Sequence, residues 1–333
     1  MLFNILYLTG CIPWPVAPRK RGRPYVYSPT VILRCFIVRI WFKIDSNNAL
    51  HTFLDMDCQY NRKLALACGL ATIPGRRTFD RRLKTISADI KERISTMGHL
   101  FVTEELVGLS ITAIDSTLLK AKGCVWHKSS MKRGVVPRSG IDTDARWGYS
   151  HTKGWIFGYK LHLTSTTAVG DLVVPLTADV TTANVPDNQM YVALTSSSSS
   201  SSSIFLLPIL RHMAADPGYD DRKLYEYSKK TLGMDLVCPV ERYKNTPKER
   251  LELVCFYQST LGQAIYNHRG ISIEPLIEHI KSVFRIDSLA VRGFHTVSAV
   301  VLLSVLLYQI MVYCSCKTST INPKSIKYML GTY

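Results

Sequence analysis

The feature that most constrains this chain is an uncharged run from Thr296 to Cys316, TVSAVVLLSVLLYQIMVYCSC. About 20 apolar residues are enough for a helix to cross a lipid bilayer, so a membrane span is one interpretation. A helix that is buried on all sides within a protein has the same composition. Ser298, Ser304 and Gln309 interrupt the run with polar side chains. These residues favour a helix in a protein core over a membrane span.

Charge and composition narrow the class of protein further. The 333 residues include 41 Lys and Arg against 25 Asp and Glu, a formal net charge of +16. Hydrophobic residues make up 47%, which is too apolar for an intrinsically disordered chain and enough for a large core. An excess of positive charge is typical of proteins that bind nucleic acid or an anionic membrane surface. Charge alone does not choose between these two partners.

The cysteines indicate a reducing compartment. There are nine of them, no Cys-x-x-Cys pair occurs, and no histidine cluster completes a zinc set. We therefore expect buried free thiols and a cytoplasmic protein. The apolar stretch from Leu2 to Val16 lacks a basic region ahead of it and contains Pro13 and Pro15, so we do not expect a signal peptide.

The first part of the chain, residues 1–108, is helical and basic. Thr78 is a candidate N-cap for a helix that extends to Ile94 and carries Arg81 and Arg82. A short turn followed by a basic helix is typical of a DNA-contacting module, so we expect this region to bind DNA or to dimerise. A solvated charged face on a structural helix is the alternative interpretation.

A basic arm, Arg19-Lys20-Arg21-Gly22-Arg23-Pro24, lies ahead of this helix. An extended arm of this composition fits an A·T-rich minor groove, whose negative potential attracts arginine side chains. Arg21 and Arg23 are therefore candidate DNA contacts. A plain basic tail is the alternative.

The second part, residues 109–333, changes to a pattern that predicts an α/β fold. Four stretches have the composition of strands: Leu109–Leu119, Phe157–Thr164, Leu172–Val180 and Asp235–Val240. Consecutive strands followed by alternating helix and strand predict a mixed sheet with helices on its faces. Eight consecutive serines, residues 196–203, cannot pack a core and predict a flexible tract.

The most informative carboxylate is Asp115, inside the strand-like run SITAIDSTLL. A buried, unpaired charge in a sheet costs several kcal/mol, so such an acid usually has a cation as partner. A metal ion is one such partner. A salt bridge, or a strand end that faces solvent, is the structural alternative.

Asp216 is the second candidate acid and lies in Ala-Ala-Asp-Pro-Gly-Tyr-Asp, where a strand is expected to end and the chain to turn. Carboxylates at the carboxyl ends of strands are common active-site positions in open α/β sheets. An Asp before Pro-Gly is also an ordinary turn former, so Asp216 alone decides nothing.

The third candidate acid, Glu274, lies at the start of an expected helix. Pro275 is tolerated in a helix only in its first turn, which places Glu274 there. Glu274, Glu278 and Lys281 then share one face, because they are spaced by four and seven residues. A capped surface helix with an internal ion pair is the alternative.

Together, Asp115, Asp216 and Glu274 form a recognisable chemical set. Carboxylates from different elements can hold two Mg²⁺ ions about 3.5–4 Å apart, one activating the attacking oxygen and one stabilising the leaving oxygen of a phosphoryl transfer. Mg²⁺ prefers oxygen ligands and keeps several waters, so few protein carboxylates suffice, and Mn²⁺ is a candidate substitute. The basic surface is expected to contact the phosphates of DNA.

Several stretches share the pattern of one known family: GRPYVYSP, IPGRRTFDRRL, AIDSTLLKAKG, GIDTDARWGYSHTKGWIFGYKLHL, ADVTTANVPDN, ADPGYD and the segment from Tyr266 to Lys281. Over roughly residues 20 to 313, the chain resembles the DDE transposases of bacterial and archaeal insertion sequences. In this resemblance, Asp115 and Asp216 match the two catalytic aspartates, and Glu274 matches the glutamate. The resemblance implies a ribonuclease H-like mixed sheet flanked by helices, preceded by an all-helical basic N-terminal domain.

Tyr266, Arg269, Glu274 and Lys281 match the family's Tyr-Arg-Glu-Lys signature, whose basic members contact DNA at the transposon end. The gap between Arg269 and Glu274 is one residue longer than in the family, which leaves Glu278 as an alternative third acid. The serine tract is foreign to the family pattern. It raises the question of whether this copy is active.

The resemblance implies a transposase that cuts DNA at the inverted ends of its element and transfers the freed 3′-hydroxyl to target DNA. It also implies a homodimer in the active complex, a cytoplasmic, nucleoid-associated location and no membrane. The uncharged run then follows the helix with Glu274, where such proteins pack further helices on the core. An inactive relic that only binds DNA, a stand-alone nuclease and a basic membrane-associated protein are the alternatives.

Overall fold

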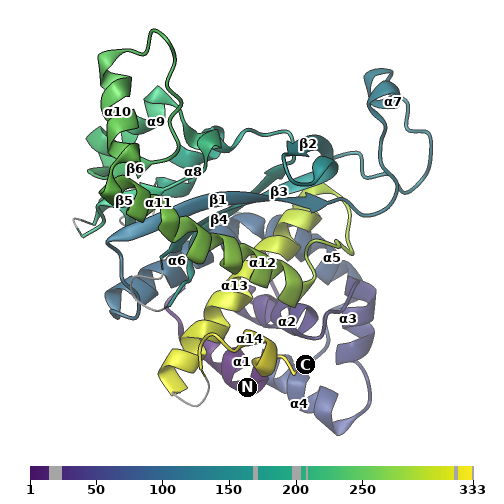
Figure 1. Cartoon of the computed structure of the whole chain (residues 1–333). Helices are drawn as coiled ribbons and strands as arrows, with labels where there is room; N and C mark the ends of the chain where they lie inside the picture. Colours follow the sequence, from purple (N-terminus) through teal and green to yellow (C-terminus); the bar gives the residue numbers. More distant parts are fainter. Residues whose placement is uncertain (15–24, 168–171, 197–203, 208, 319–321, 332–333) are drawn as a thin grey trace.

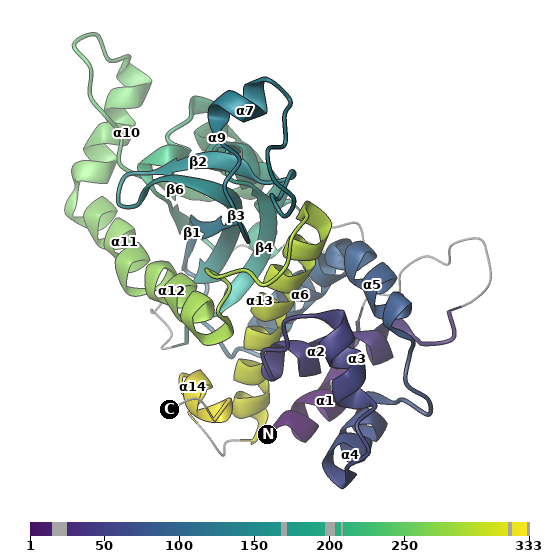
Figure 2. The same cartoon turned by 90° about the vertical axis from the view of Figure 1, so that its right-hand side faces the viewer.

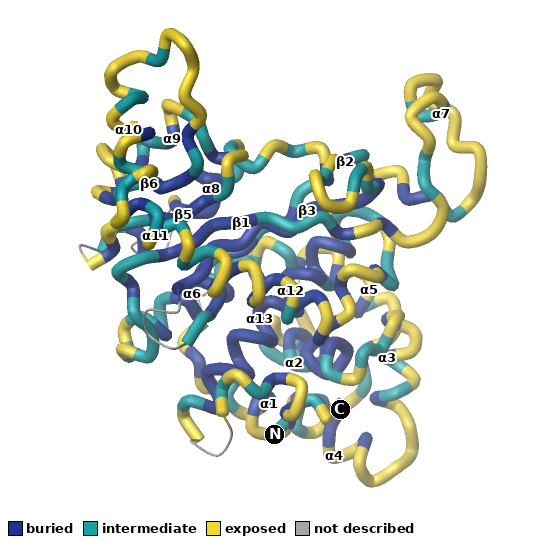
Figure 3. Tube along the Cα trace, viewed as in Figure 1, coloured by how far each residue is buried: buried dark blue, intermediate teal, exposed yellow. Residues whose placement is uncertain are grey.

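The uncharged run forms helix α13 (Phe294–Thr318), which passes through the middle of the molecule (Figure 1). The protein is represented by a computed structural model, which describes residues 1–14, 25–167, 172–196, 204–207, 209–318 and 322–331. By length and composition α13 could cross a membrane, but 94% of its most apolar stretch is buried within the protein. The expected core helix is therefore confirmed (Figure 3).

Helix α13 joins the two layers of the fold. It packs against α6 (Ser87–Thr103) of the N-terminal part and against β4 (Pro175–Thr182) of the sheet. The amide Nε2 of its buried Gln309 donates hydrogen bonds to the carbonyl oxygens of Ile94, at 3.0 Å, and Pro175, at 2.9 Å. A polar residue in the uncharged run thus ties a helix and a strand together, because a buried amide needs hydrogen-bond partners.

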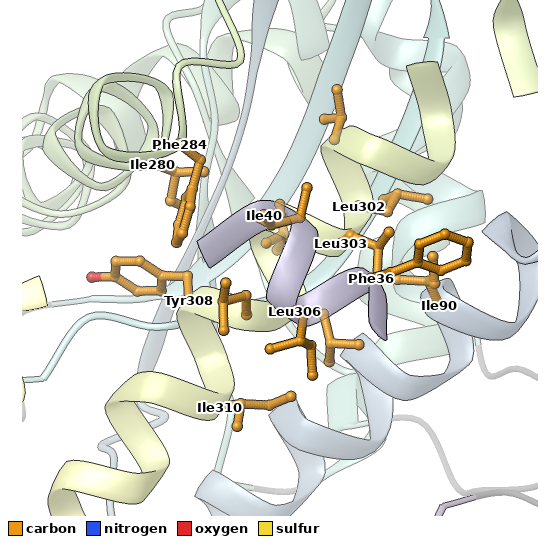
Figure 4. Close-up of a cluster of buried hydrophobic side chains, with 14 of the residues drawn as sticks. Phe36, Ile40, Ile90, Ile280, Phe284, Leu302, Leu303, Leu306, Tyr308 and Ile310 are labelled. Carbon is orange, nitrogen blue, oxygen red and sulfur yellow. The ribbon is translucent and has the colours of Figure 1, made fainter. Parts of the chain in front are cut away.

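The N-terminal part consists of helices that surround one side of α13 (Figure 2). They are α1 (Leu2–Cys11), α2 (Pro29–Trp41), α3 (Asn47–Leu54), α4 (Gln59–Cys68), α5 (Arg76–Thr85) and α6. Ser28 begins α2, because its hydroxyl oxygen accepts the backbone N–H of Val31 and Pro29 fits the first turn. Phe36 of α2 belongs to one buried cluster with Leu303 of α13 (Figure 4).

The expected helix from the Thr78 cap to Ile94 is wrong in its bounds. Two helices occupy the stretch, because α5 begins at Arg76 and the chain bends at Ile86 before α6 begins at Ser87. The bend allows α5 to pack against α3 while α6 lies along β4.

A six-stranded mixed sheet forms the other layer. Its strands are β1 (Ile111–Lys120), β2 (Arg146–Ser150), β3 (Gly154–Thr166), β4, β5 (His212–Ala214) and β6 (Asp235–Val237). The order is β2-β3-β1-β5-β6, and β4 also pairs with β3. Strand β3 is antiparallel to β1, β2 and β4, whereas β5 is parallel to β1 and to β6. The predicted α/β class with a mixed sheet is confirmed.

The remaining helices and turns connect strands, cover the sheet or, in the case of α14, pack against α13. They are α7 (Lys128–Lys132), η2 (Asp187–Met190), α8 (Tyr191–Thr195), η3 (Ile204–Leu206), η4 (Pro217–Tyr219), α9 (Arg222–Tyr227), the π-helical turn η5 (Ser228–Leu232), α10 (Lys248–Gln258), α11 (Thr260–Ile271), α12 (Ile273–Phe284) and α14 (Ile326–Met329). As predicted, α12 has Glu274 in its first turn. Of the serine tract, only Ser196 lies within the described residues.

All nine cysteines are free, as the sequence predicts. The expectation that they are buried is wrong for Cys11, Cys58, Cys124 and Cys255, which are exposed. Since free thiols on a surface are stable against pairing only in a reducing medium, their exposure is compatible with the expected compartment.

Candidate active site

Asp115 lies on the central strand β1, with β3 on one side and β5 on the other. Its carboxylate is nearly buried: one oxygen accepts the backbone N–H of Ser116 at 2.8 Å, and the other accepts Nη2 of Arg269 at 2.8 Å. Burial raises the pKa of Asp115 to about 6, against the opposing charge of Arg269, and the negative charge of Asp216 raises it further. Asp115 therefore does form a salt bridge, with Arg269, but this ion pair does not fully offset the cost of burying the carboxylate charge.

Strand register places Asp216 beside Asp115. Ala113 of β1 pairs with Ala214 of the parallel strand β5, and each aspartate follows its alanine by two residues. Asp216 caps the turn η4, because its Oδ1 accepts the N–H of Gly218 at 3.0 Å. Burial and then the charge of Asp187 raise the pKa of Asp216. Two carboxylates with raised pKa values thus lie side by side.

Arg269 connects Glu274 to this pair. It lies in the last turn of α11 and contacts Glu274 Oε1 through Nη1 at 3.2 Å while Nη2 binds Asp115. The side chain of Glu274 is 50% exposed. Tyr266, one turn earlier, has its hydroxyl 3.4 Å from Nη1 of Arg269. One guanidinium therefore links acids that are far apart in the sequence.

Glu278 and Lys281 form a separate pair on α12. The ammonium of Lys281 donates to Glu278 Oε1 at 2.7 Å, and this bond lowers the pKa of the Glu278 carboxyl. The side chain of Glu278 is 66% exposed, whereas that of Lys281 is almost fully buried. Arg269 binds Glu274 and is not among the partners of Glu278 in the described residues. The contacts favour Glu274 over Glu278 as the third acid, and that assignment stays a prediction.

The candidate DNA contacts of the N-terminal part differ in their exposure, and the structure describes only two of them. Arg81 is exposed on α5, and the guanidinium of Arg82 lies over the ring of Tyr25 at 4.1 Å from its centroid. Arg21 and Arg23 lie outside the described residues. Arg81 is therefore accessible to a partner, whereas Arg82 already contacts Tyr25.

The sequence interpretation missed Asp187, which lies next to the candidate site. Its Oδ1 accepts hydrogen bonds from the Ser116 hydroxyl at 2.7 Å and from Lys160 Nζ at 3.0 Å. A Cβ atom on Gly218 would lie 3.5 Å from Asp187 Oδ2 and 3.1 Å from Asp216 Oδ1, so the two carboxylates face the same glycine. Asp187, the second of two acids in ADVTTANVPDN, was the available signal, but its long-range partners are invisible in the sequence.

His162 completes this neighbouring cluster. It is fully buried, its Nε2 lies 2.8 Å from Thr181 Oγ1, and its Nδ1 lies 3.6 Å from Asp187 Oδ1. Burial lowers the pKa of His162 to about 4; the charge of Asp187 opposes this effect and that of Lys160 adds to it. The imidazole is therefore neutral at physiological pH.

A family model for the transposase DDE domain matches residues 107–310. The chain belongs to this transposase family. No curated protein and no solved structure matches it. The mixed sheet, in which β5 and β6 run parallel to β1 while β3 and β4 form its antiparallel part, agrees with the ribonuclease H-like fold of DDE transposases. The expectations of a DDE transposase and of this fold are confirmed.

Membership of this family assigns the chain a general role in DNA transposition. Action on DNA also suggests a cytoplasmic location. DDE transposases form a family of polynucleotidyl transferases and nucleases that generally use divalent metals.

The residues of this transposase fit a divalent cation in their donor chemistry. Asp115 and Asp216 offer carboxylate oxygens, which Mg²⁺ and Mn²⁺ prefer. Burial, and then the negative charge of a neighbouring aspartate, raise the pKa of both groups, and a bound cation would oppose this effect. Among the residues that the structure describes, no three His, Cys, Asp or Glu side chains form a preassembled metal cluster. The third acid, Glu274, is linked to the pair through Arg269.

Proposed function

We propose that this transposase cuts DNA at the ends of its insertion sequence and transfers the freed 3′-hydroxyl to a target phosphodiester. The observation that carries the proposal is the register of β1 and β5, which brings Asp115 and Asp216 together in a family whose name refers to such acids. Both reactions are in-line displacements at phosphorus and can use the same acids in turn.

Asp115, Asp216 and Glu274 are the proposed ligands of two Mg²⁺ ions, with Mn²⁺ as a substitute. When bound, the ions supply Lewis-acid activation of the attacking and leaving oxygens. The chain itself supplies three carboxylates. Asp115 is held by the Ser116 N–H, Asp216 by the Gly218 N–H and Glu274 by Arg269. Holding the acids before substrate arrives lowers the cost of organising the site during the reaction.

DNA is proposed to reach these acids along a basic surface. Arg269 and Tyr266 are one turn apart on α11 next to Asp115, which suits contacts to a phosphate near the cleaved bond. Lys281 is proposed to act on the same strand, although it must exchange its bond with Glu278 to do so. Residues 1–108 are proposed to recognise the DNA ends and to support a homodimer, with Arg81, Arg82, Arg21 and Arg23 as DNA contacts.

Cleavage and joining of a labelled DNA that carries the end of the element tests this proposal. Wild type would be compared, in Mg²⁺ or Mn²⁺, with Asp115→Asn, Asp216→Asn and Glu274→Gln, and with Glu249→Gln on exposed α10 as the matched control. We expect joined products from wild type and control only. Cleavage without joining in a target plasmid would indicate a stand-alone nuclease, and end binding without cleavage by wild type would indicate an inactive relic.

A further inference from the structure

Two aromatic side chains lie exposed and paired on the hairpin formed by β2 and β3. Tyr149 and Trp155 face each other across the two strands, and their ring centroids are 5.3 Å apart. Tyr149 is 55% exposed and Trp155 is 58% exposed. Large aromatic side chains left in water lose the free energy of burial, so a pair of them on a strand surface indicates a binding partner.

Two lysines and a histidine lie near this aromatic pair. The ammonium of Lys128, from α7, lies 3.2 Å from the centroid of the Trp155 ring. Lys153 and His151 are exposed in the turn that joins the strands, and the His151 ring lies 5.5 Å from that of Tyr149. Figure 3 shows the chain around α7 as largely exposed. Aromatic side chains next to lysines suit a ligand that carries both flat rings, which stack on the aromatic faces, and negative charges, which the lysines attract.

The hairpin that carries the pair is firmly anchored. Trp147 on β2 packs against Phe157 on β3, and its indole N–H donates to the carbonyl of Trp126 at 2.8 Å. Gly148 lies against the end of β4 so closely that a Cβ atom would be 2.4 Å from the carbonyl oxygen of Ala183. The exposed rings therefore project from a rigid base, which limits the entropy lost when a ligand binds.

The hairpin also lies close to the helix that carries the third candidate acid. The positive charge of Lys153 lowers the pKa of Glu278, one turn beyond Glu274 on α12. The turn between β2 and β3 is therefore within electrostatic reach of α12.

We propose that Tyr149 and Trp155 form a stacking site for unpaired bases of DNA, with Lys128 and Lys153 contacting the adjoining phosphates. This inference rests on the proposed function in taking DNA as the substrate. A blunt duplex hides the faces of its bases, whereas a single strand or a locally opened end presents them to aromatic rings. The surrounding cations favour such a strand over an apolar protein surface.

Equilibrium binding of a labelled single-stranded oligonucleotide and of the blunt duplex of the same sequence tests the proposal. We expect Trp155→Ala and Tyr149→Ala each to weaken single-strand binding by about tenfold, with little change for the duplex. Trp155→Phe should keep most of the affinity, because it retains an aromatic face. Tyr243→Ala is the matched control, since Tyr243 is 58% exposed with Arg250 near its ring but lies on another loop.

The charged part of the site has its own readout. Lys153→Ala leaves the aromatic pair intact, and it should reduce the slope of log affinity against log salt by about 0.7 for the single strand. An unchanged slope would show that Lys153 does not contact the phosphates of the single strand. This variant also keeps the proposal testable if an aromatic substitution perturbs folding, which circular dichroism would detect.

The remaining outcomes separate this inference from the proposed function. Equal affinity for the single strand in wild type and both alanine variants would overturn the stacking site but would not contradict the proposed transposase reaction. Dissociation of a dimer by Trp155→Ala, seen by light scattering, would identify the pair as a self-association surface instead. Failure of wild type to bind either DNA would overturn the proposed function itself.

Discussion

The two sides of the candidate site hold their acids in different ways. Asp115 and Asp216 lie on or directly after paired strands, so the hydrogen-bond register of β1 and β5 places them side by side. Glu274 lies on helix α12, is half exposed, and contacts the site through an ion pair with Arg269. A shift of strand register would move every side chain of β1 to the opposite face, whereas an ion pair can be exchanged without refolding. Strand pairing thus places the two aspartates, whereas the half-exposed carboxylate of Glu274 is held by one ion pair that can be exchanged.

The largest effect is expected on the strand side. Asp115→Asn or Asp216→Asn should lower the rate of DNA cleavage by about a thousandfold or more, because each removes a charge that the proposed phosphoryl transfer requires. Single-turnover cleavage of labelled end DNA measures this loss, and circular dichroism checks that the fold persists. Wild-type rates in both variants would show that the strand pair is not the catalytic pair.

The helix side should lose activity without losing stability. Glu274→Gln is expected to lower cleavage by about a hundredfold or more, yet to change the free energy of unfolding by less than about 1 kcal/mol, because an ion pair at a half-exposed group contributes little. Glu278→Gln should keep cleavage, since its partner is Lys281. The opposite result for the two variants would move the third acid one turn along α12.

A pH effect should distinguish the buried strand side from the helix side. His162 has a pKa of about 4 in the folded protein against 6.5 as its ordinary value. The unfolded chain therefore takes up a proton at this histidine first, and the contribution of His162 to the free energy of unfolding should fall by up to about 3 kcal/mol as pH drops from 6.5 to 4. The raised pKa of Asp115 acts in the opposite direction in wild type and variant alike, so it cancels in their difference. Denaturant titrations of wild type and His162→Gln at several pH values measure the difference. A parallel pH dependence in both proteins would contradict this role of His162.

The smallest effect is expected at Asp187, which borders the strand pair without belonging to it. Asp187→Asn removes the counter-charge of Lys160, whose ammonium then competes with a metal ion near Asp216. The Mg²⁺ concentration for half-maximal cleavage should rise several-fold, by an electrostatic effect of about 1 kcal/mol. The double variant Asp187→Asn/Lys160→Met should restore much of the wild-type requirement. No restoration would indicate that Asp187 acts through the Ser116 hydroxyl instead.

The sequence was most informative where the signal was local. Asp115 within a strand and Glu274 before Pro275 follow from periodicity and from the rules for proline in helices, and the structure has them in those elements. The mixed sheet and the core helix also follow from residue patterns, whereas the family was predicted from a resemblance over roughly residues 20 to 313. The bend at Ile86 was missed, because it depends on what α5 and α6 each contact and not on a local breaker.

The rest depended on contacts between distant residues. Asp187 reaches Ser116 and Lys160 across two strands, so no spacing rule could connect them. A spacing of four residues places Glu274 and Glu278 on the same face of a helix, and only the position of Arg269 separates them. Tyr149 and Trp155 are close in the sequence, but their position opposite each other follows from the register of β2 and β3.

Helix α13 lies at the centre of the core but near the end of the chain, so the core can close only late in synthesis. During synthesis, α1 to α6 and the strands leave the ribosome before α13, and their apolar faces await a partner encoded near residue 300. Contacts over such long sequence separations slow folding, and they leave unfinished chains exposed to aggregation or proteolysis. Gln309 bonds to Ile94 and Pro175 only when nearly the whole chain is available. A truncated translation product that stops before α13 would therefore lack a closed core, and its exposed apolar faces would make it prone to aggregation or proteolysis.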